Sequence, residues 1–330
     1  MSQVALLLSP DALAAAYGAP VFARLRERAG EPLVVAPADA WRAHADALRD
    51  TEVIFSGWGA PRMDEEFLRA VPKLRAVFYA GGSVRYFVTD ALWRRGVRLT
   101  TAQAINAIPV AEFTAAAIVL GLKRVWHYAR VTRETRDFPT ERPMPAAFGT
   151  VVGLVSYGTI ARLVRERLRT LEVEVVVYDP LLRAEDARRE GMRKVELDEL
   201  FAISDAVSVH TPQLPETLGL IRGAHLERMR SGTFFLNTAR GAIVNEPEMI
   251  DVLRRRPDLQ AFLDVTAPEP PAADSPLYTL PNVVLTPHIA GSVGSECLRM
   301  GHAMIDEFER LRAGKPLRWE ITAARAELIA

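Results

Sequence analysis

Short apolar runs alternate along the chain with longer segments in which apolar residues recur every three or four positions. Such runs are typical of strands buried on both faces of a parallel sheet, and the longer period is typical of covering helices. The segments predicted to be strands are residues 4–8, 53–56, 76–79, 151–155, 173–178, 206–210, 233–237, 261–264 and 283–286. Those predicted to be helices are residues 12–28, 64–70, 110–133, 159–170, 197–202 and 246–254. This order predicts an α/β fold with mostly parallel, doubly wound sheets.

A polar, proline-rich stretch interrupts this alternation at residues 134–149, after the long helix predicted over residues 110–133. Prolines and polar residues in such a cluster indicate a loop before a new strand. The chain has 330 residues, enough for two domains of roughly 100–200 residues each.

Composition narrows the classes of function. Lys and Arg together number 41, as do Asp and Glu, so there is no basic excess to favour nucleic acid or a membrane surface as partner. The single cysteine, Cys297, makes an intramolecular disulfide impossible and fits a reducing compartment. Residues 1–8 have no basic n-region and indicate a first strand rather than a signal peptide, and no run approaches the ~18–20 apolar residues of a membrane span. We therefore expect a cytoplasmic protein.

Three side chains that carry chemistry follow predicted strands: Arg240, Glu269 and His288. Ligands bind outside the carboxyl ends of parallel strands, so these residues are predicted to converge on one site. An arginine for an anion, with a histidine oriented by a carboxylate, suggests acid–base chemistry on a substrate that carries a carboxylate. Taken singly, each residue has a common structural alternative: a surface arginine, a structural histidine, or a solvated glutamate among prolines.

A strand, a tight turn and a helix start at residues 151–162 approximate the dinucleotide-binding pattern Gly-x-Gly-x-x-Gly. Gly158 occupies the second glycine position, whereas Ser156 and Ala161 occupy the first and third. Alone, an ordinary strand-to-helix turn explains this segment equally well. The turn residues predicted to contact the cofactor are Tyr157, Gly158, Thr159 and Ile160.

Asp179 strengthens the cofactor hypothesis because it ends the next strand, 21 residues after Gly158. An acidic residue near this spacing accepts hydrogen bonds from an adenosine ribose and repels a 2′-phosphate, which favours NAD over NADP. The alternative is an aspartate that only caps a turn before Pro180.

Six segments together resemble the D-isomer-specific 2-hydroxyacid dehydrogenases. They are residues 106–112 (Asn-Ala-Ile-Pro-Val-Ala-Glu), 156–162, 207–212 (Val-Ser-Val-His-Thr-Pro), 237–241 (Asn-Thr-Ala-Arg-Gly), 263–265 with 268–270 (Leu-Asp-Val and Pro-Glu-Pro), and 286–291 (Thr-Pro-His-Ile-Ala-Gly). They occur in the family's order over most of the chain, and the turn at Ser156 is the poorest match.

The resemblance implies a discontinuous two-domain fold and a homodimer. A flavodoxin-like substrate-binding domain is expected at residues 1–105 and 291–330, and a Rossmann NAD-binding domain at residues 106–290.

The resemblance also implies roles for individual residues. Arg240 binds the substrate carboxylate and polarises the 2-keto oxygen, His288 is the general acid in reduction, and Glu269 orients the imidazole and raises its pKa. The backbone of Gly81, Gly82 and Ser83 is expected to grip the carboxylate opposite Arg240, with a flexible turn as the alternative. Further residues expected at the cofactor are Thr211, Pro212, Thr238, Ala239, Asp264 and Gly291.

The implied reaction is reversible hydride transfer between NAD(H) and a small 2-oxo or 2-hydroxy acid, with glyoxylate- or hydroxypyruvate-type substrates favoured. Two alternatives stay open: an NAD(H)-sensing, corepressor-like dimer without turnover, and a phosphite-type dehydrogenase. Trp58 and Arg85 are candidates for shaping the substrate pocket, although packing and solvation explain them as well. His210 receives no catalytic role, and no Cys, His and Asp cluster has metal-ligand spacing, so no metal is expected.

Overall fold

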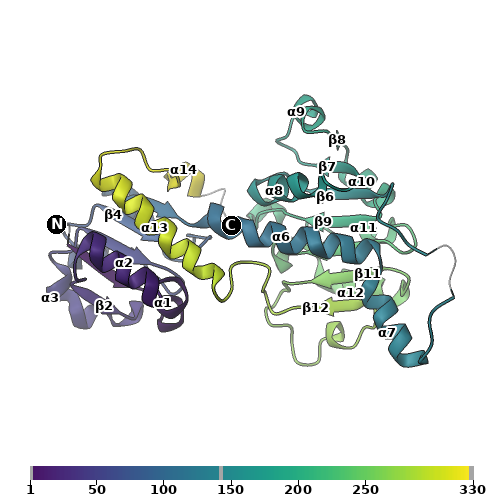
Figure 1. The fold of residues 1–330 in the computed structure, drawn as a ribbon, viewed down its shortest axis with the longest axis horizontal. Coiled ribbons are helices and arrows are strands. Elements are labelled where there is room, and N and C mark those ends of the chain that lie inside the picture. Colours follow the sequence, from purple (N-terminus) through teal and green to yellow (C-terminus); the bar gives the residue numbers. More distant parts are fainter. Residues whose placement is uncertain (1–2, 141–143, 327–330) are drawn as a thin grey trace. The chain divides into compact units, whose positions relative to one another are not determined.

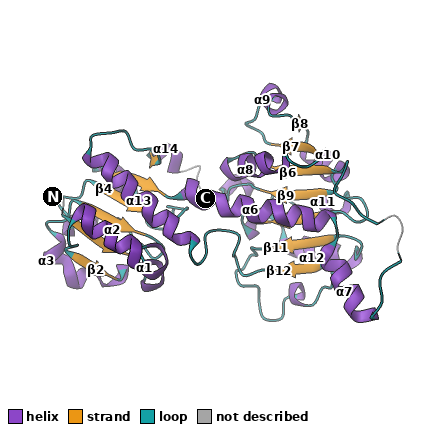
Figure 2. Ribbon diagram, in the orientation of Figure 1, coloured by secondary structure: helices purple, strands orange, loops and turns teal. Residues whose placement is uncertain are grey.

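The computed structural model describes residues 3–140 and 144–326. The chain divides into two compact units. The first unit contains the described residues up to Asn106 together with those from Ser292 onward, and the second runs from Ala107 to Gly291. Each unit has its own sheet (Figures 1 and 2), and the buried apolar residues of each unit form their own clusters.

The first unit is built on a sheet whose strand order is β13-β5-β4-β3-β1-β2. Its strands are β1 (Val4–Leu7), β2 (Val34–Ala36), β3 (Val53–Ser56), β4 (Ala76–Tyr79), β5 (Arg98–Thr101) and β13 (Glu320–Ile321). All neighbours pair in parallel except β13, which runs antiparallel to β5. The carboxyl ends of β1, β3 and β4 therefore meet at one edge, which carries the predicted substrate loop.

Helices cover both faces of this sheet. On one face lie α1 (Pro10–Ala16), α2 (Ala19–Ala29) and α13 (Glu296–Arg312), which form a core with alternate residues of β1, β3 and β4. On the other lie η1 (Ala38–His44), α3 (Ala45–Leu48), α4 (Glu65–Ala70) and α5 (Asp90–Arg94). The short α14 (Ala323–Ala326) follows β13. The long α13 was not among the helices predicted from the pattern.

One predicted helix, over residues 12–28, is wrong as a single element, because the structure has two helices there. Helix α1 ends at Ala16 and α2 begins at Ala19. Gly18 is the residue before α2, and Pro20 stands in its first turn, where a missing N–H costs no hydrogen bond. The proline and glycine thus start a new helix in a new direction.

The second unit has a parallel sheet with strand order β12-β11-β10-β9-β6-β7-β8. Its strands are β6 (Val151–Val155), β7 (Glu174–Tyr178), β8 (Arg193–Lys194), β9 (Ala206–Val209), β10 (Phe234–Asn237), β11 (Gln260–Leu263) and β12 (Val283–Leu285). Their apolar residues are buried on both faces, as the continuous runs in the sequence predict. The order reverses between β6 and β9, and ligands bind near such a switch point.

Two layers of helices flank this second sheet. Helices α6 (Gln103–Leu122) and α8 (Thr159–Leu168) pack on one face, and α10 (Leu197–Ile203), α11 (Gly223–Glu227) and α12 (Glu246–Arg255) on the other. The remaining helices are α7 (Val125–Thr135), α9 (Ala184–Arg189), η2 (Pro215–Thr217), η3 (Gly241–Ile243) and η4 (Pro276–Tyr278). Helix α6 approaches the sheet closely at Gly121, where a Cβ atom would lie 2.1 Å from the Phe234 ring.

The segment predicted as one helix over residues 110–133 is also two helices. Helix α6 begins earlier, at Gln103, contains Pro109 and ends at Leu122. Arg124 then takes a left-handed backbone conformation (φ 50°), which breaks the helix before α7. Glu134 and Thr135 belong to α7, so the predicted loop begins only at Arg136, and residues 141–143 of that prediction lie outside the described residues.

Helix α6 also corrects the expectation that no segment has the length and apolarity of a membrane span. In the described part of the chain, this helix alone meets both criteria, with half of the tested window buried inside the structure. Its apolar side chains, among them Ala117, Ile118 and Leu122, pack in the core with β6 and β10. A core helix of a globular domain meets the same criteria for this reason.

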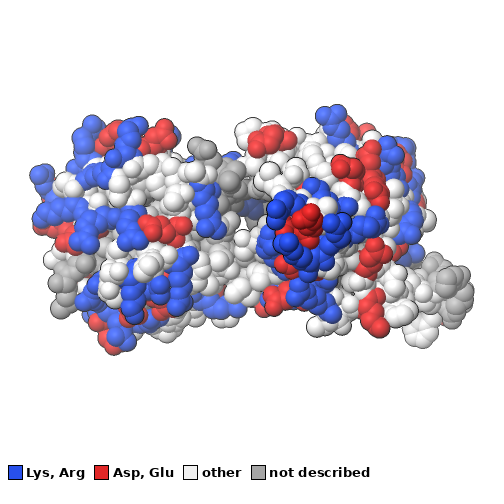
Figure 3. Space-filling model, turned by 90° about the horizontal axis from the view of Figure 1, so that it is seen from above, with Lys and Arg blue, Asp and Glu red and all other residues white. Residues whose placement is uncertain are grey.

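Charged side chains gather over α8 and α9 of the second unit (Figure 3). Lys and Arg dominate this face, with acidic residues among them. Arg183 and Arg189 both pair with Asp186, at 2.7 and 3.0 Å, and Arg169 pairs with Glu190 at 2.8 Å. The arginine-rich surface is thus partly neutralised by its own ion pairs.

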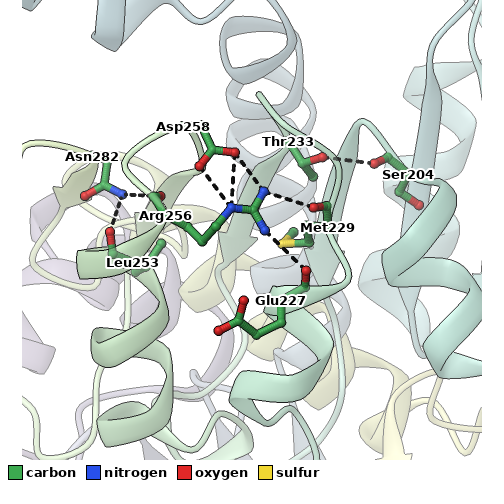
Figure 4. Close-up of polar contacts among 8 residues, drawn as sticks. All are labelled: Ser204, Glu227, Met229, Thr233, Leu253, Arg256, Asp258 and Asn282. Atoms are coloured by element: carbon green, nitrogen blue, oxygen red, sulfur yellow. Dashed lines mark hydrogen bonds and ion pairs between the residues drawn. The ribbon is translucent and has the colours of Figure 1, made fainter.

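Polar contacts lie at the amino ends of β9 to β12, and Figure 4 shows the residues that make them. Arg256 donates to the carbonyls of Glu227 and Met229 at 3.2 and 3.1 Å and pairs with Asp258 at 2.7 Å. Asn282 donates to the carbonyls of Leu253 and Arg256. Because most acceptors are backbone carbonyls at element ends, this network fixes where the strands and helices of this edge begin and end.

Candidate functional site

Three loops of the second unit leave neighbouring strands at the same edge of the sheet. The loop after β10 carries Arg240, the loop after β11 carries Glu269, and the loop after β12 carries His288. These strands pair in parallel in the order β10, β11, β12, so their carboxyl ends are adjacent. The strand pattern of the sequence therefore brings the three predicted side chains to one edge.

His288 and Glu269 contact each other directly. Nδ1 of His288 lies 2.6 Å from Oε1 of Glu269, within hydrogen-bond distance. The two side chains are 46% and 42% exposed, so both stay accessible on this unit. With Nδ1 held by the carboxylate, Nε2 is the ring nitrogen that remains to exchange a proton with a ligand.

Asp264 holds the loop that carries His288. Its Oδ1 accepts hydrogen bonds from the Thr286 hydroxyl at 2.6 Å and the Ile289 amide at 2.8 Å, and its Oδ2 from the Ala290 amide at 2.9 Å. The His288 amide donates to the Asp264 carbonyl at 3.0 Å, and His288 itself has a left-handed backbone (φ 53°). A carboxylate that is only 1% exposed thus fixes a backbone conformation that a histidine rarely adopts.

Asn237 shapes the loop of Arg240 in a similar way. Its amide nitrogen donates to the Arg240 carbonyl, and its amide oxygen accepts from the Ala239 N–H, both at 3.0 Å. The Arg240 guanidinium donates to the Ala239 carbonyl at 2.6 Å. Burial lowers the pKa of Arg240, and the negative charge of Glu269 opposes that shift. Glu269 therefore interacts electrostatically with Arg240 as well as contacting His288.

The Arg240 and Glu269 loops pack against each other through Gly241. A Cβ atom on this glycine would lie 2.0 Å from the carbonyl carbon of Thr266. The Thr266 hydroxyl donates to the Pro268 carbonyl at 2.8 Å, and the Ala267 amide donates to Oε2 of Glu246, in the first turn of α12, at 2.9 Å. Backbone contact on one side and a carboxylate on the other thus hold the segment that leads to Glu269.

The predicted dinucleotide turn lies between β6 and α8. Gly158 precedes the first turn of α8, and a Cβ atom there would have nothing within 4 Å. In the part of the chain that the structure describes, no side chain caps this helix start, and Gly158 and Thr159 are exposed. Exposed first-turn N–H groups at a positive helix end suit an anion such as a pyrophosphate. Tyr157 is buried, and Arg162 stacks over its ring at 4.6 Å.

Asp179 contacts this turn. Its Oδ2 accepts the Tyr157 amide at 2.8 Å, and its Oδ1 accepts the amides of Leu181 and Leu182 at 2.7 and 2.9 Å. Asp179 therefore caps the turn around Pro180, as expected if it has only a structural role. These contacts do not exclude a ribose, because a carboxylate offers about four acceptor positions.

Two hydroxyl pairs anchor neighbouring loops. Oγ of Ser156 lies 2.9 Å from Oγ1 of Thr211, and Oγ1 of Thr238 lies 2.9 Å from Oγ1 of Thr114 in α6. Each pair is buried. Thr211 and Thr238, both predicted to contact the cofactor, are thus tied to other elements of the unit.

The predicted substrate loop of the first unit follows β4. Gly81 lies against the Tyr79 ring, where a Cβ atom would be 2.6 Å away, and its amide donates to the Tyr79 carbonyl at 3.0 Å. That amide thus has one partner within the fold. The substrate-binding role of Gly81, Gly82 and Ser83 stays a prediction.

An aromatic residue that the sequence did not single out lies beside this loop. The Tyr86 hydroxyl donates to the Gly57 carbonyl at 3.2 Å, accepts the Ala60 amide at 3.3 Å and lies 3.1 Å from the Tyr79 hydroxyl. It thereby joins the loops that follow β3 and β4, and its side chain remains half exposed. Trp58, in the loop after β3, is partly exposed as well.

Three other residues at the site also escaped the sequence analysis: Asn237, Glu246 and Asn106. Asn106 accepts the Ser292 amide at 2.8 Å, at the point where the chain returns to the first unit. The only available signal was position: Asn237 and Asn106 lie inside motifs that were recognised for other residues. Glu246 had no such signal.

His210 is partly buried. Its Nε2 lies 3.0 Å from the Ser208 hydroxyl, and burial lowers its pKa to about 3. A ring that stays neutral throughout the physiological range does not act as an acid–base group there. Among the described residues, no group of three or more His, Cys, Asp or Glu side chains is arranged to hold a metal ion.

Comparison with known proteins gives a family for this arrangement. The profile described as the D-isomer specific 2-hydroxyacid dehydrogenase, NAD binding domain, matches residues 116–290. A glyoxylate reductase of Korarchaeum cryptofilum is 30% identical, over 82% of this chain and 82% of its own length. The structure of D-mandelate dehydrogenase from Rhodotorula graminis superposes with a TM-score of 0.79 at 25% identity, and covers 97% of this chain and 98% of its own.

A D-3-phosphoglycerate dehydrogenase of Archaeoglobus fulgidus is 32% identical over 78% of this chain, but over only 49% of its own length. The chain thus spans about half the length of such relatives. The family profile matches more than half of the chain. The glyoxylate reductase matches most of the chain over most of its own length. Together these two matches establish the family. The chain belongs to the D-isomer-specific 2-hydroxyacid dehydrogenase family.

Proposed function

We propose that this protein is an NAD-dependent dehydrogenase that interconverts a small 2-oxo acid and the corresponding D-2-hydroxy acid. One observation carries the proposal: the contact between Nδ1 of His288 and Oε1 of Glu269, with the partly buried Arg240 on a neighbouring loop. This arrangement supplies a proton carrier, a group that orients it and a fixed cation, which is what reduction of a carbonyl next to a carboxylate requires.

Arg240 is assigned to the substrate carboxylate, because its planar guanidinium matches two carboxylate oxygens. Its partly buried position strengthens that attraction, since a charge is less screened away from water. The same cation draws electrons from the neighbouring 2-keto oxygen and so favours attack at carbon 2.

His288 is assigned to the proton. In reduction, its protonated ring gives the Nε2 proton to the oxygen that was the ketone, while Glu269 holds Nδ1 and so orients the ring. In oxidation, neutral Nε2 takes the hydroxyl proton. Asp264 supports both directions because it fixes the loop on which the ring stands.

The residues of the second unit fit a bound dinucleotide. Open space at Gly158 and an uncapped start of α8, within the described residues, suit a pyrophosphate, and Asp179 suits an adenosine ribose. Residues proposed to hold it are Tyr157, Gly158, Thr159, Ile160, Asp179, Thr211, Pro212, Thr238, Ala239, Asp264 and Gly291. When bound, NADH supplies the hydride, while the protein supplies orientation and charge.

The proposal is tested by following NADH oxidation with the purified protein and a series of 2-oxo acids. We propose glyoxylate and hydroxypyruvate as the preferred substrates, which the similarity to a glyoxylate reductase supports. The series includes pyruvate and bulkier aromatic 2-oxo acids, because the exposed side chains of Trp58 and Tyr86 lie in the loops after β3 and β4. Binding of NADH without turnover of any member, in either direction, contradicts the proposal.

We also propose a preference for NAD over NADP, carried by Asp179. The carboxylate repels a 2′-phosphate, so kcat/KM is expected to be at least about tenfold higher with NADH than with NADPH. Asp179→Asn removes the charge and keeps the size of the side chain. It is expected to lower the ratio of kcat/KM with NADH to kcat/KM with NADPH. A parent protein that prefers NADPH contradicts the assignment.

A homodimer is proposed as the assembly. Two large apolar side chains that follow α7 in the sequence are exposed, Phe138 by 82% and Phe148 by 73%. Burial of such side chains against a second copy removes apolar surface from water. Sedimentation equilibrium of the parent and of Phe148→Ser tests this: the parent is expected as a dimer and the variant as a weaker one. A monomeric parent at micromolar concentration contradicts it.

A cytoplasmic location is proposed on the chemistry of Cys297, which is a free and buried thiol. Such a thiol persists where the compartment is reducing. Fractionation of cells that express the protein with an internal epitope tag tests the location.

A further inference from the structure

Ser156 occupies the position where the dinucleotide-binding pattern has its first glycine, and its backbone is left-handed (φ 74°). This region suits glycine, because a Cβ atom there crowds the following carbonyl group. Yet the residue is a serine that is only 8% exposed, and its amide donates to the Tyr178 carbonyl at 2.7 Å. The chain therefore keeps an unfavourable side chain at a position where the favourable residue is the smallest one.

The hydroxyl of Ser156 has a specific partner in another loop. Its Oγ lies 2.9 Å from Oγ1 of Thr211, which is itself 3% exposed, and Oγ1 of Thr211 donates to the Val155 carbonyl at 3.4 Å. A hydroxyl has one proton, and Thr211 uses its own for the Val155 carbonyl. In the contact between the two hydroxyls, Ser156 is therefore the donor and Thr211 the acceptor. A glycine at position 156 has no group with which to make this contact.

The contact joins two loops that leave adjacent strands. Strands β6 and β9 pair in parallel, with Val155 opposite Val209, so the Ser156 turn and the Thr211 loop emerge side by side. Both loops belong to the surface proposed to hold the dinucleotide. A buried hydroxyl pair between them limits how far they move apart before a ligand arrives.

We propose that Ser156 is a positioning residue for the dinucleotide. Its hydroxyl holds the Thr211 loop in the conformation that binds NAD(H). This contact requires a serine at position 156, in spite of the left-handed backbone there. A protein that is already ordered loses less conformational freedom on binding, so the contact raises affinity without touching the ligand. The inference rests on the proposed function only in that the ligand is NAD(H).

Two substitutions at position 156 separate the hydroxyl from the backbone. Ser156→Ala removes the hydroxyl and keeps a Cβ atom, whereas Ser156→Gly removes both. If the proposal holds, the Kd for NADH, measured by titration calorimetry, rises about fivefold in both variants, as expected for one lost neutral hydrogen bond. Thermal unfolding gives a second readout, in which Ser156→Gly is expected to be more stable than Ser156→Ala, because only glycine relieves the left-handed backbone.

Substitutions at Thr211 test whether the effect passes through that residue. Thr211→Val removes the acceptor and is expected to raise the Kd about as much as Ser156→Ala, and the double variant is expected to add little to either. Thr211→Ser keeps the hydroxyl and is expected to bind NADH more tightly than Thr211→Val does. The KM for NADH is expected to rise together with the Kd.

Two results overturn the inference. One is a Ser156→Gly protein that binds NADH as tightly as the parent, which makes the hydroxyl irrelevant. The other is a double variant whose loss equals the full sum of the single losses, which makes the two residues independent. If Ser156→Ala does not fold, Ser156→Gly and Thr211→Val decide the matter. Failure of the parent itself to bind NADH contradicts the proposed function instead, so the two failures are distinguishable.

Discussion

Nδ1 of His288 lies 2.6 Å from Oε1 of Glu269, although the two residues follow different strands and 19 positions separate them in sequence. The contact forms because the loops after β11 and β12 leave adjacent strands and each is fixed by further hydrogen bonds, to Glu246 and to Asp264. The imidazole is therefore oriented before any ligand binds, and its Nε2 atom is left for a ligand.

Replacement of His288 by alanine is expected to lower kcat by about 10²- to 10⁴-fold, because the proton carrier is lost. The Kd for NADH is expected to stay within about twofold, since His288 is assigned to the substrate rather than to the dinucleotide. Steady-state kinetics and calorimetry measure the two quantities. Glu269→Gln is the matched variant: it keeps the shape but not the charge, and a loss of kcat smaller than that of His288→Ala is expected. Near-normal turnover of His288→Ala contradicts the assignment.

Gly241→Ala is expected to damage both stability and turnover. The added Cβ atom would lie 2.0 Å from the carbonyl carbon of Thr266, so the Arg240 and Glu269 loops must separate. A cost of about 1–3 kcal/mol in the free energy of unfolding is typical of overpacking, and a displaced Arg240 is expected to raise the KM for the 2-oxo acid. Urea unfolding and steady-state kinetics measure these effects. Gly219→Ala is the control for a glycine outside this contact: it has a positive φ but nothing within 4 Å of its Cβ position. Equal kinetic losses in the two variants would exclude the proposed role of the packing.

The strands of the second unit could be predicted from sequence because their apolar side chains are buried on both faces, as in residues 151–155. Strand β5 was missed because Arg98, Thr100 and Thr101 break its apolar run. The breaks at Gly18 and Arg124 were also missed. A helical period continues across such points, whereas the change of direction depends on backbone angles that packing decides.

In the candidate site, too, some features could be predicted from the sequence and others could not. Arg240, Glu269 and His288 were predicted from their place after strands and within recognised motifs, and the order of the strands brings their loops to one edge. The sequence did not predict that Asn237 shapes the Arg240 loop, that Glu246 holds the segment before Glu269, or that the Gly81 amide is used within the fold. These are hydrogen bonds between residues or groups whose geometry depends on the folded loops, and no spacing rule encodes them.

His210 is expected to make stability depend on pH. Burial lowers its pKa to about 3 in the folded protein, whereas an unfolded histidine has a pKa near 6.5, so between these values the unfolded state binds the extra proton. Stability contributed by the neutral ring is therefore fully present above pH ~6.5 and is lost as the pH falls, by up to about 1.4 kcal/mol for each pH unit below that value.

Urea unfolding between pH 7 and pH 5 measures this dependence. The parent is expected to lose roughly 1–2 kcal/mol more than His210→Asn over that range. His44→Asn, at an exposed position, is the matched control and is expected to behave as the parent does. Parallel curves for the parent and His210→Asn would show that another group is responsible.

Arg256→Ala is expected to lower stability without changing turnover. The substitution leaves the carbonyls of Glu227 and Met229 and the Asp258 carboxylate without their donor, at an expected cost of about 2–3 kcal/mol. The affected groups (Figure 4) lie near the amino ends of the strands, whereas the loops of the candidate site follow their carboxyl ends. Chemical unfolding and kcat/KM at a temperature well below the transition measure the two effects. A large fall in kcat/KM would mean that the two edges of the sheet are coupled.

The position of the Arg256 network has a consequence for how this protein can change over generations. Contacts to backbone carbonyls do not depend on which side chains its neighbours carry. The loops after the carboxyl ends of the strands can therefore acquire insertions and new side chains, while the contacts of Arg256 and Asn282 keep the strands in register. In such a protein, the fold can stay the same over generations while the loops that contact the substrate change.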